Sequence, residues 1–366
     1  MKCFHYFKDK FRSKEQRSFK PLCSTASPHS ISELDEAKAL NLRIFSFSEL
    51  RKATRNFNPG LRIGEGSFGS VYKGKIKPAN GKGEPLVVAI KKLNMDVFQG
   101  HTEWLAELKI LGVLEHPNVI KLIGLCTVDG EKGFRHLLVY EFMQNRSLED
   151  HLFTQAFPPL PWKTRLQIIL GAARALAYLH EGFTVQITHR SFNPSDVLLD
   201  DKFNPKLSDF GLAREGPLAG DKHVTTRVMG TYGYAAPEYV ATGHLSYKNE
   251  VWSFGVVLYE ILSGKRSIYV NRPSSEQSLV EWVKEFPADG ERFGSIMDPG
   301  LGNQYSIGAA REIAKLANAC LSTSPKERPK MSEVVQRLEH IIQISEEGNA
   351  DASETIEPAE TNLEVE

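Results

Sequence analysis

Residues 64–71 read Gly64-Glu65-Gly66-Ser67-Phe68-Gly69-Ser70-Val71, and residues 88–91 read Val88-Ala89-Ile90-Lys91. The glycines of the first stretch leave a bare backbone that can lie against phosphate groups. The same glycine spacing occurs in dinucleotide-binding folds, but there it opens a helix, whereas here Val71 and Tyr72 continue into strand-like sequence. We therefore expect a phosphate-binding turn between two strands.

Lys91 follows this turn at the distance expected of the strand that aims a lysine at the α and β phosphates of ATP. The stretch from Leu61 to Leu93 has glycine punctuation, β-branched residues and no helical period, which predicts a small antiparallel sheet. A helical pattern covers Glu103 to Leu114. Glu103 and Glu107 share one face of that helix, and either can pair with Lys91.

Later segments have a helical period. One apolar face recurs through residues 166–177, and Val251 to Leu262 is apolar nearly all round, which is typical of a helix buried in a larger helical lobe. The apolar face comprises Leu166, Ile169, Leu170, Ala173 and Ala177. Together these patterns predict an α+β chain, with a small antiparallel β-sheet N-lobe that carries one helix and a larger helical C-lobe.

Composition narrows the function classes. The 366 residues, 41% of them hydrophobic, suffice for one large domain or two moderate ones. Lys plus Arg and Asp plus Glu each total 45, so no overall field draws the chain to nucleic acid, and we expect no nucleic-acid partner. The four cysteines show neither zinc-type pairing nor the density of a disulfide framework and read as free thiols. No stretch approaches the roughly 20 apolar residues of a membrane span, and the N-terminus lacks the apolar core of a signal peptide. We therefore expect an intracellular protein.

Charge is segregated at the two ends of the chain. Residues 1–44 form an arm and linker, whose first twenty residues carry seven basic and two acidic side chains interleaved with aromatic rings. Such a mixture can place rings among lipid headgroups while the cations meet anionic lipid, and a solvated arm is the alternative. Residues 21–32 are rich in Ser, Thr and Pro and predict a linker. Residues 343–366 read as an acidic disordered tail.

Folded structure is expected to begin with a short helix over residues 45–56. Ser46 and Glu49 have the spacing of a capping box, and Phe45 is placed to pack against Leu50 as a hydrophobic staple. Pro59 follows, so the helix should end before it.

Further motifs accumulate in the order found in protein kinases. Asp209-Phe210-Gly211 has the form of the metal-binding motif, and Ala236-Pro237-Glu238 closes an activation segment. The span from about Phe57 to Ile342 resembles a protein kinase. Within that family the chain resembles the plant receptor-like cytoplasmic kinases, subfamily seven. The segments that carry this closer resemblance are Phe45 to Leu50, Ala53-Thr54, His223 to Thr231, Asn249 to Gly255 and Arg328 to Met331.

The resemblance implies a two-lobed kinase fold, with the N-lobe at about residues 57–143 and the C-lobe at about 144–342. It implies ATP with Mg²⁺ or Mn²⁺ as cofactors, Tyr140 as the gatekeeper, and an Arg328–Glu238 pair inside the large lobe. The nucleotide-binding residues that it implies are Ile63, Gly64, Glu65, Gly66, Ser67, Phe68, Gly69, Ser70, Val71, Lys91, Glu141 and Met143. It favours Glu107 as the catalytic partner of Lys91, and Asp196 and Asp209 as metal ligands.

The catalytic loop departs from the family. It reads His189-Arg190-Ser191-Phe192-Asn193-Pro194-Ser195-Asp196, where the kinase pattern has Asp at the third position and Asn at the eighth. Ser191 stands at the position of the catalytic base, and a serine cannot hold the charge that accepts a hydroxyl proton. Asn193 replaces a lysine that helps neutralise the transferring phosphate, and Asp196 replaces an asparagine, although a carboxylate still ligates a hard cation. Glu250 stands where most relatives have an Asp that supports the loop, which puts the rigidity of the loop in doubt.

Two function classes follow from these residues. The first is an active Ser/Thr kinase that tolerates the altered loop. The second is an ATP-binding pseudokinase that acts as a scaffold or decoy for other protein kinases or immune receptors. Thr225 and Thr226 are the candidate phosphorylation sites, with Arg190 as a candidate phosphate partner.

Localisation is predicted from the arm. Lys2 follows Met1 where N-myristoylation requires a glycine, so palmitoylation of Cys3 and the basic cluster would supply the two signals of a stable anchor. We expect peripheral association with lipids at the cytoplasmic face of the plasma membrane, with the cytoplasm as the alternative.

Overall fold

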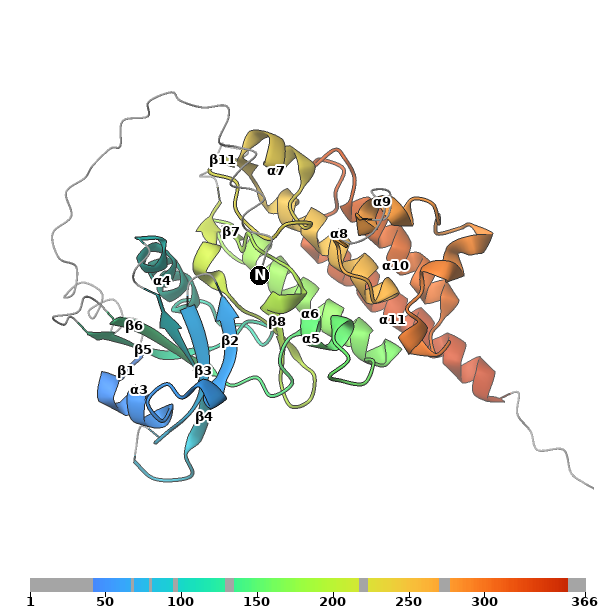
Figure 1. The fold of residues 1–366 in the computed structure, drawn as a ribbon. Coiled ribbons are helices and arrows are strands. Elements are labelled where there is room, and N and C mark those ends of the chain that lie inside the picture. Colours follow the sequence, from blue (N-terminus) through green and yellow to red (C-terminus); the bar gives the residue numbers. More distant parts are fainter. Residues whose placement is uncertain are drawn as a thin grey trace, which may run out of the picture.

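A six-stranded sheet forms the lobe at the N-terminal end of the described chain, and a bundle of helices forms the other lobe (Figure 1). This computed structural model describes residues 42–66, 69–78, 81–94, 98–128, 135–216, 223–269 and 277–354. The architecture is the predicted α+β, two-lobed arrangement.

The strands of the large sheet lie in the order β1-β5-β6-β4-β3-β2. They are β1 (Arg43–Ile44), β2 (Arg62–Gly66), β3 (Gly69–Ile76), β4 (Leu86–Leu93), β5 (Leu122–Val128) and β6 (Arg135–Glu141). The five strands from β2 to β6 pair antiparallel, as predicted. The prediction missed β1, which pairs parallel with β5. Two residues are too few to show an alternating pattern in the sequence.

Between strands β1 and β2 lies the short helix α3 (Phe47–Ala53), which is shorter than the predicted residues 45–56. The Ser46 side chain caps it by accepting the backbone N–H of Glu49. The side chain of Glu49 forms an ion pair with Arg43 at 2.7 Å, a partner that strand β1 supplies. Phe45 and Leu50 belong to one buried cluster of the sheet lobe, which agrees with the predicted hydrophobic staple.

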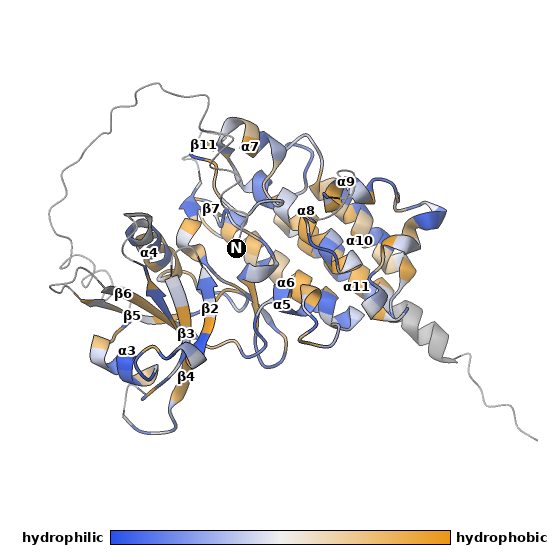
Figure 2. Ribbon diagram, in the orientation of Figure 1, coloured by the Kyte–Doolittle hydropathy of each residue, from blue (hydrophilic) through white to orange (hydrophobic). Residues whose placement is uncertain are grey.

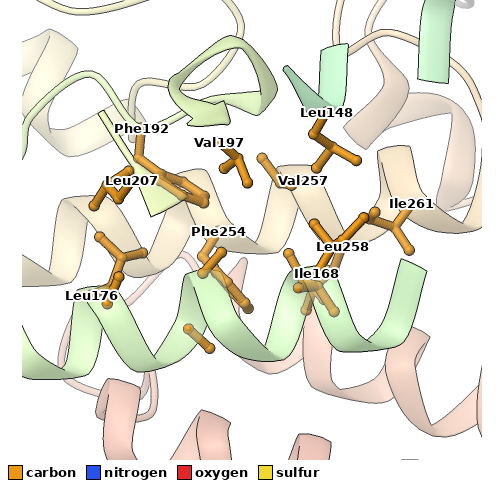
Figure 3. Close-up of a cluster of buried hydrophobic side chains, with 14 of the residues drawn as sticks. Leu148, Ile168, Leu176, Phe192, Val197, Leu207, Phe254, Val257, Leu258 and Ile261 are labelled. Atoms are coloured by element: carbon orange, nitrogen blue, oxygen red, sulfur yellow. The ribbon is translucent and has the colours of Figure 1, made fainter. Parts of the chain in front are cut away.

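The helical lobe is built around α6 (Trp162–Glu181) and α8 (Tyr247–Ser263), which pack together in its centre (Figure 3). Ile168 and Leu176 of α6 and Phe254 and Leu258 of α8 are buried there, and Figure 2 shows that α8 is hydrophobic along much of its length. This arrangement confirms the prediction of a buried helix. The helices of this lobe are α5 (Leu148–Phe153), α6 (Trp162–Glu181), α7 (Pro237–Thr242), α8 (Tyr247–Ser263), α9 (Leu279–Val283), α10 (Ile307–Cys320) and α11 (Met331–Glu354).

Helix α11 extends into the segment that was predicted to be a disordered tail. The helix continues to Glu354, whereas the tail was expected to begin at residue 343. Ser345 is buried, and its hydroxyl accepts the indole N–H of Trp162 at 2.9 Å. That contact holds α11 against α6 beyond residue 343. Residues 355–366 lie outside the described residues.

Several further features bear on the predictions. None of the helices that the structure describes is both long and apolar enough to span a bilayer. Cys126 and Cys320 are buried free thiols, and burial raises their pKa to about 11 and about 12.

Arg328 donates to both carboxylate oxygens of Glu238, at 2.7 and 2.8 Å, so the expected ion pair is present.

Candidate active site

The glycine-rich segment forms the hairpin of β2 and β3. Its register pairs Gly64 with Val71 and Gly66 with Gly69, so the sequence is a strand turn and not the start of a helix. A Cβ at Gly69 would collide with the carbonyl of Lys92 on the adjacent strand β4, which explains the need for glycine there. Ser67 and Phe68, predicted to bind nucleotide, lie outside the described residues.

Three charged side chains meet at the centre of the site. Lys91 Nζ lies 2.8 Å from Glu107 Oε2 and 2.9 Å from Asp209 Oδ1. Lys91 is carried by β4 and Glu107 by helix α4 (Phe98–Leu111), so the expected pair joins the sheet to its helix. Glu103, the other candidate partner of Lys91, is buried beside Gly211. A Cβ added to Gly211 would lie 3.2 Å from the Cβ of Glu103.

The two carboxylates control the charge of Lys91. Burial opposes the ammonium form, but the charges of Asp209 and Glu107 outweigh it and raise the pKa of Lys91. Reciprocally, Lys91 lowers the pKa of Asp209. Lys91 is therefore a fixed cation at the position expected to face nucleotide phosphates.

The link between the lobes begins at the end of β6. Tyr140, the expected gatekeeper, is buried, and burial together with the nearby Glu107 raises its pKa well above the usual value. The Glu141 side chain turns toward Lys206, at 2.9 Å, and accepts the backbone N–H of Lys121. Met143 follows in the buried core. That the backbones of Glu141 and Met143 contact adenine stays a prediction.

The catalytic loop follows strand β7 (Ile187–Thr188) and is anchored by Phe192. The Phe192 ring is almost fully buried and stacks on Phe254 of α8, with ring centroids 5.8 Å apart (Figure 3). Arg190 adopts a left-handed backbone conformation with φ of 80°.

Glu250 of α8 braces this loop. One of its carboxylate oxygens accepts the backbone N–H of Arg190, and the other lies 2.6 Å from His180 Nε2. The sequence placed the rigidity of the loop in doubt because the resemblance implies an Asp at this position. The structure shows that the longer Glu250 side chain reaches the loop backbone. His180 is the contact that sequence reasoning missed, because it comes from a different helix, α6.

Asn193, at the position of the missing lysine, turns into the loop. Its amide nitrogen donates to Asp196 Oδ2 at 2.7 Å, to the Ser191 carbonyl at 2.8 Å and to Thr231 Oγ1 at 3.2 Å. Its amide oxygen accepts from the Ser195 backbone at 2.8 Å. The side chain thus crosslinks the loop and carries no charge toward a phosphate.

The two candidate metal ligands differ in access. The Asp209 side chain is 51% exposed, so it can offer an oxygen to a divalent cation. Asp196 is 5% exposed, and burial followed by the charge of Asp209 raises its pKa well above the usual value. In the part of the chain that the structure describes, no three His, Cys, Asp or Glu side chains gather as a metal site. The residues therefore fit a cation that Asp209 holds together with nucleotide phosphates, whereas Asp196 is buried and its Oδ2 already accepts a hydrogen bond from Asn193.

The activation segment is held against the helical lobe. Strand β11 (Val224–Thr225) pairs antiparallel with β12 (His244–Leu245). Thr225 is exposed, whereas Thr226 is half-buried and its hydroxyl accepts from the Arg190 guanidinium at 2.7 Å. The predicted phosphate partner therefore already contacts one of the two predicted phosphorylation sites.

This fold and site define a protein kinase domain. The model of the protein tyrosine and serine/threonine kinase family matches residues 58–338, and the chain belongs to that family.

Its relatives narrow the assignment to plants. The chain is 53% identical over 329 residues to the probable serine/threonine-protein kinase PBL20 of Arabidopsis thaliana. The aligned region covers 88% of this chain and 83% of PBL20. It is 49% identical over 335 residues to receptor-like cytoplasmic kinase 176 of Oryza sativa subsp. japonica, with 89% and 82% covered. Within the kinase family, it therefore groups with the PBL-type plant receptor-like cytoplasmic Ser/Thr kinases.

Proposed function

We propose that this chain binds ATP with Mg²⁺ or Mn²⁺ but transfers phosphate poorly, and that it acts as a pseudokinase in plant receptor-kinase and immune signalling. The observation that carries the proposal is Ser191, which occupies the position of the proton-accepting aspartate. A serine hydroxyl is neutral at physiological pH, so it neither takes the substrate proton nor orients the attacking hydroxyl as a carboxylate does.

Two other residues of the catalytic loop, Asn193 and Asp196, should also weaken phosphate transfer. Asn193 supplies no positive charge to the transferring phosphate and is engaged within the loop. Asp196 Oδ2 accepts a hydrogen bond from that same amide, so only its other carboxylate oxygen is left for a second cation. Electrostatic stabilisation of the moving phosphoryl group is the main contribution of a kinase site, and these changes weaken it.

The retained groups support nucleotide binding. The hairpin of β2 and β3, the Lys91–Glu107 pair and the exposed carboxylate of Asp209 are all in place. The family uses ATP and a divalent metal in general. Loss of the base leaves these contacts intact, because it lies on a separate loop.

A second candidate function is an active Ser/Thr kinase. General-base assistance contributes only roughly 10² to 10⁴ in rate, and phosphoryl transfer depends largely on positioning. The ordered Lys91–Glu107 pair and the braced loop favour this alternative. In both candidates an upstream kinase would modify Thr225, which is exposed, or Thr226, whose hydroxyl contacts Arg190.

The experiment that tests nucleotide binding compares the wild type with Lys91→Met. Saturating ATP with Mg²⁺ or Mn²⁺ should raise the melting temperature of the wild type, because a ligand that binds only the folded state stabilises it. Lys91→Met removes the cation between Glu107 and Asp209 and should shrink that increase. If the melting curve of the wild type does not move and the variant behaves identically, the proposed nucleotide site is wrong.

A further inference from the structure

A serine hydroxyl and an imidazole ring meet in the catalytic loop. Ser191 Oγ lies 3.4 Å from Nδ1 of His189. Both residues are buried, with Ser191 9% exposed and His189 0% exposed. A serine within hydrogen-bond reach of a histidine that a third group orients is the arrangement of an activated nucleophile.

The third group is the carbonyl of Ser208. His189 Nε2 lies 2.7 Å from that oxygen. A carbonyl only accepts hydrogen bonds, so Nε2 carries the hydrogen, and in the neutral ring Nδ1 is the acceptor. The ring is therefore held in the tautomer that accepts the hydroxyl hydrogen of Ser191.

The pair is attached to the segment that carries Asp209. Ser208 precedes Asp209 in the chain, and the Phe210 ring that follows it packs edge-on against His189, with centroids 4.9 Å apart. Asp209 in turn contacts Lys91. Both chain neighbours of Asp209 therefore contact His189. Asp209 is the carboxylate that would hold a metal ion bound to the phosphates of ATP.

Space is available for Ser191 to move. A cavity of about 20 Å³ borders Ser191, Arg190, Thr231 and Tyr234. This is about the room that one water molecule needs. The cavity lies between the catalytic loop, the activation segment and α8, so the Ser191 side chain has room to adjust while the loop that Phe192 anchors stays in place.

We propose that Ser191 is itself a phosphoryl acceptor, with His189 as the base, an inference that rests on the proposed binding of ATP. Ser191 Oγ forms a bond to the γ-phosphorus while the bond from that phosphorus to the β,γ-bridging oxygen breaks. ADP leaves with the electron pair, and the hydroxyl proton passes to Nδ1 of His189. The product is one phosphoserine per chain. It returns a charge of about −1.5 to −2 to the position where kinases have a carboxylate.

The test uses the full chain, treated with phosphatase and then incubated with ATP and Mg²⁺ or Mn²⁺. Peptide mapping by mass spectrometry should locate phosphate on Ser191, approaching one per chain. Because the transfer is intramolecular, its rate constant should stay unchanged over a roughly tenfold range of protein concentration. Removal of the base in His189→Asn should slow it by at least about tenfold.

Matched variants keep the test informative if His189→Asn does not fold. Ser191→Thr retains a hydroxyl and should still be modified, whereas Ser191→Ala should lose this phosphopeptide and still gain melting temperature with nucleotide. A wild-type chain that is stabilised by nucleotide but stays unmodified at Ser191 overturns the inference and leaves the proposed function standing. Modification whose rate rises with protein concentration also overturns it, since another molecule then delivers the phosphate. Absence of nucleotide stabilisation contradicts both proposals.

Discussion

At the scale of single residues, burial sets the properties of several carboxyl groups, and Glu260 in α8 shows this away from the nucleotide site. Its Oε1 accepts from the Tyr234 hydroxyl at 2.8 Å and from the Ser267 backbone at 2.7 Å. Burial raises its pKa to about 8, although these two hydrogen bonds oppose the shift. The group is therefore mostly protonated at neutral pH.

This pKa predicts a pH-dependent stability. Glu260 binds its proton more tightly in the folded chain than at the ordinary value of 4.5. The stability that it contributes is complete below pH 4.5 and is lost as pH rises toward 8. Glu260→Gln, which cannot ionise, should reduce this loss by an amount on the order of a few kcal/mol. Chemical denaturation of both proteins at pH 5 and pH 8 measures the difference.

Glu285→Gln is the matched control, since Glu285 is exposed and its substitution removes one negative charge without changing a buried contact. It should keep the wild-type dependence of stability on pH. An equal pH dependence in the wild type and Glu260→Gln would contradict the account of Glu260.

At the scale of elements, α8 supports the catalytic loop through Glu250. Glu250→Ala leaves the Arg190 backbone N–H and His180 without this partner. It should lower the free energy of unfolding by roughly 2 to 4 kcal/mol, because buried polar groups without partners are costly. Glu250→Asp keeps a carboxylate that is one methylene shorter and should lose less. Denaturant titration gives both values, and equal losses in the two variants would show that the reach of the carboxylate is unimportant.

The same element shows how far sequence reasoning extends. The periodicity of residues 251–262 predicts a buried helix because nearly every side of it is apolar. The preference for Glu107 over Glu103 came from the family resemblance, since both share a helix face and spacing alone leaves the choice open. The contact of Glu250 with His180 joins two helices through residues that are 70 positions apart in the chain, and only the tertiary structure shows it.

The loop residues mark another limit of the sequence. The sequence identified Ser191, Asn193 and Asp196 as departures from the kinase pattern. It did not indicate that Asn193 turns inward to Asp196, because a side-chain orientation depends on the position of Thr231 and the rest of the activation segment. Likewise, strand β1 depends on an edge of the sheet formed by residues far along the chain.

At the scale of the whole molecule, residues 1–41 lie outside the described part of the chain, and membrane association stays a prediction from their sequence. The basic cluster and an acyl chain on Cys3 together provide the two signals that stable anchoring usually takes. Cys3→Ser should move the protein from the membrane fraction to the supernatant, most completely at high salt, which screens the basic residues. A Cys3→Ser protein that stays fully membrane-bound at high salt would contradict the anchor.

In the proposed function, the two lobes together bind a nucleotide, while the catalytic loop of the helical lobe lacks the groups that promote transfer. A triple reversion tests this division, with Ser191→Asp combined with Asn193→Lys and Asp196→Asn. The aspartate returns a proton acceptor worth roughly 10² to 10⁴ in rate, or about 3 to 5 kcal/mol of the barrier. Single reversions should gain less than the triple, because residues that act as one unit are not additive.

The most direct measurement is the rate of phosphate transfer to a generic protein substrate. It compares the wild type, the triple revertant and the Lys91→Met variant. The account predicts transfer near background for the wild type and a clear rise for the triple revertant. If the wild type transfers phosphate at a rate typical of kinases and Lys91→Met abolishes it, Ser191 is tolerated and the account is wrong. A triple revertant that binds nucleotide but stays inert would also contradict it, and would direct attention to Glu250 and the loop that it braces.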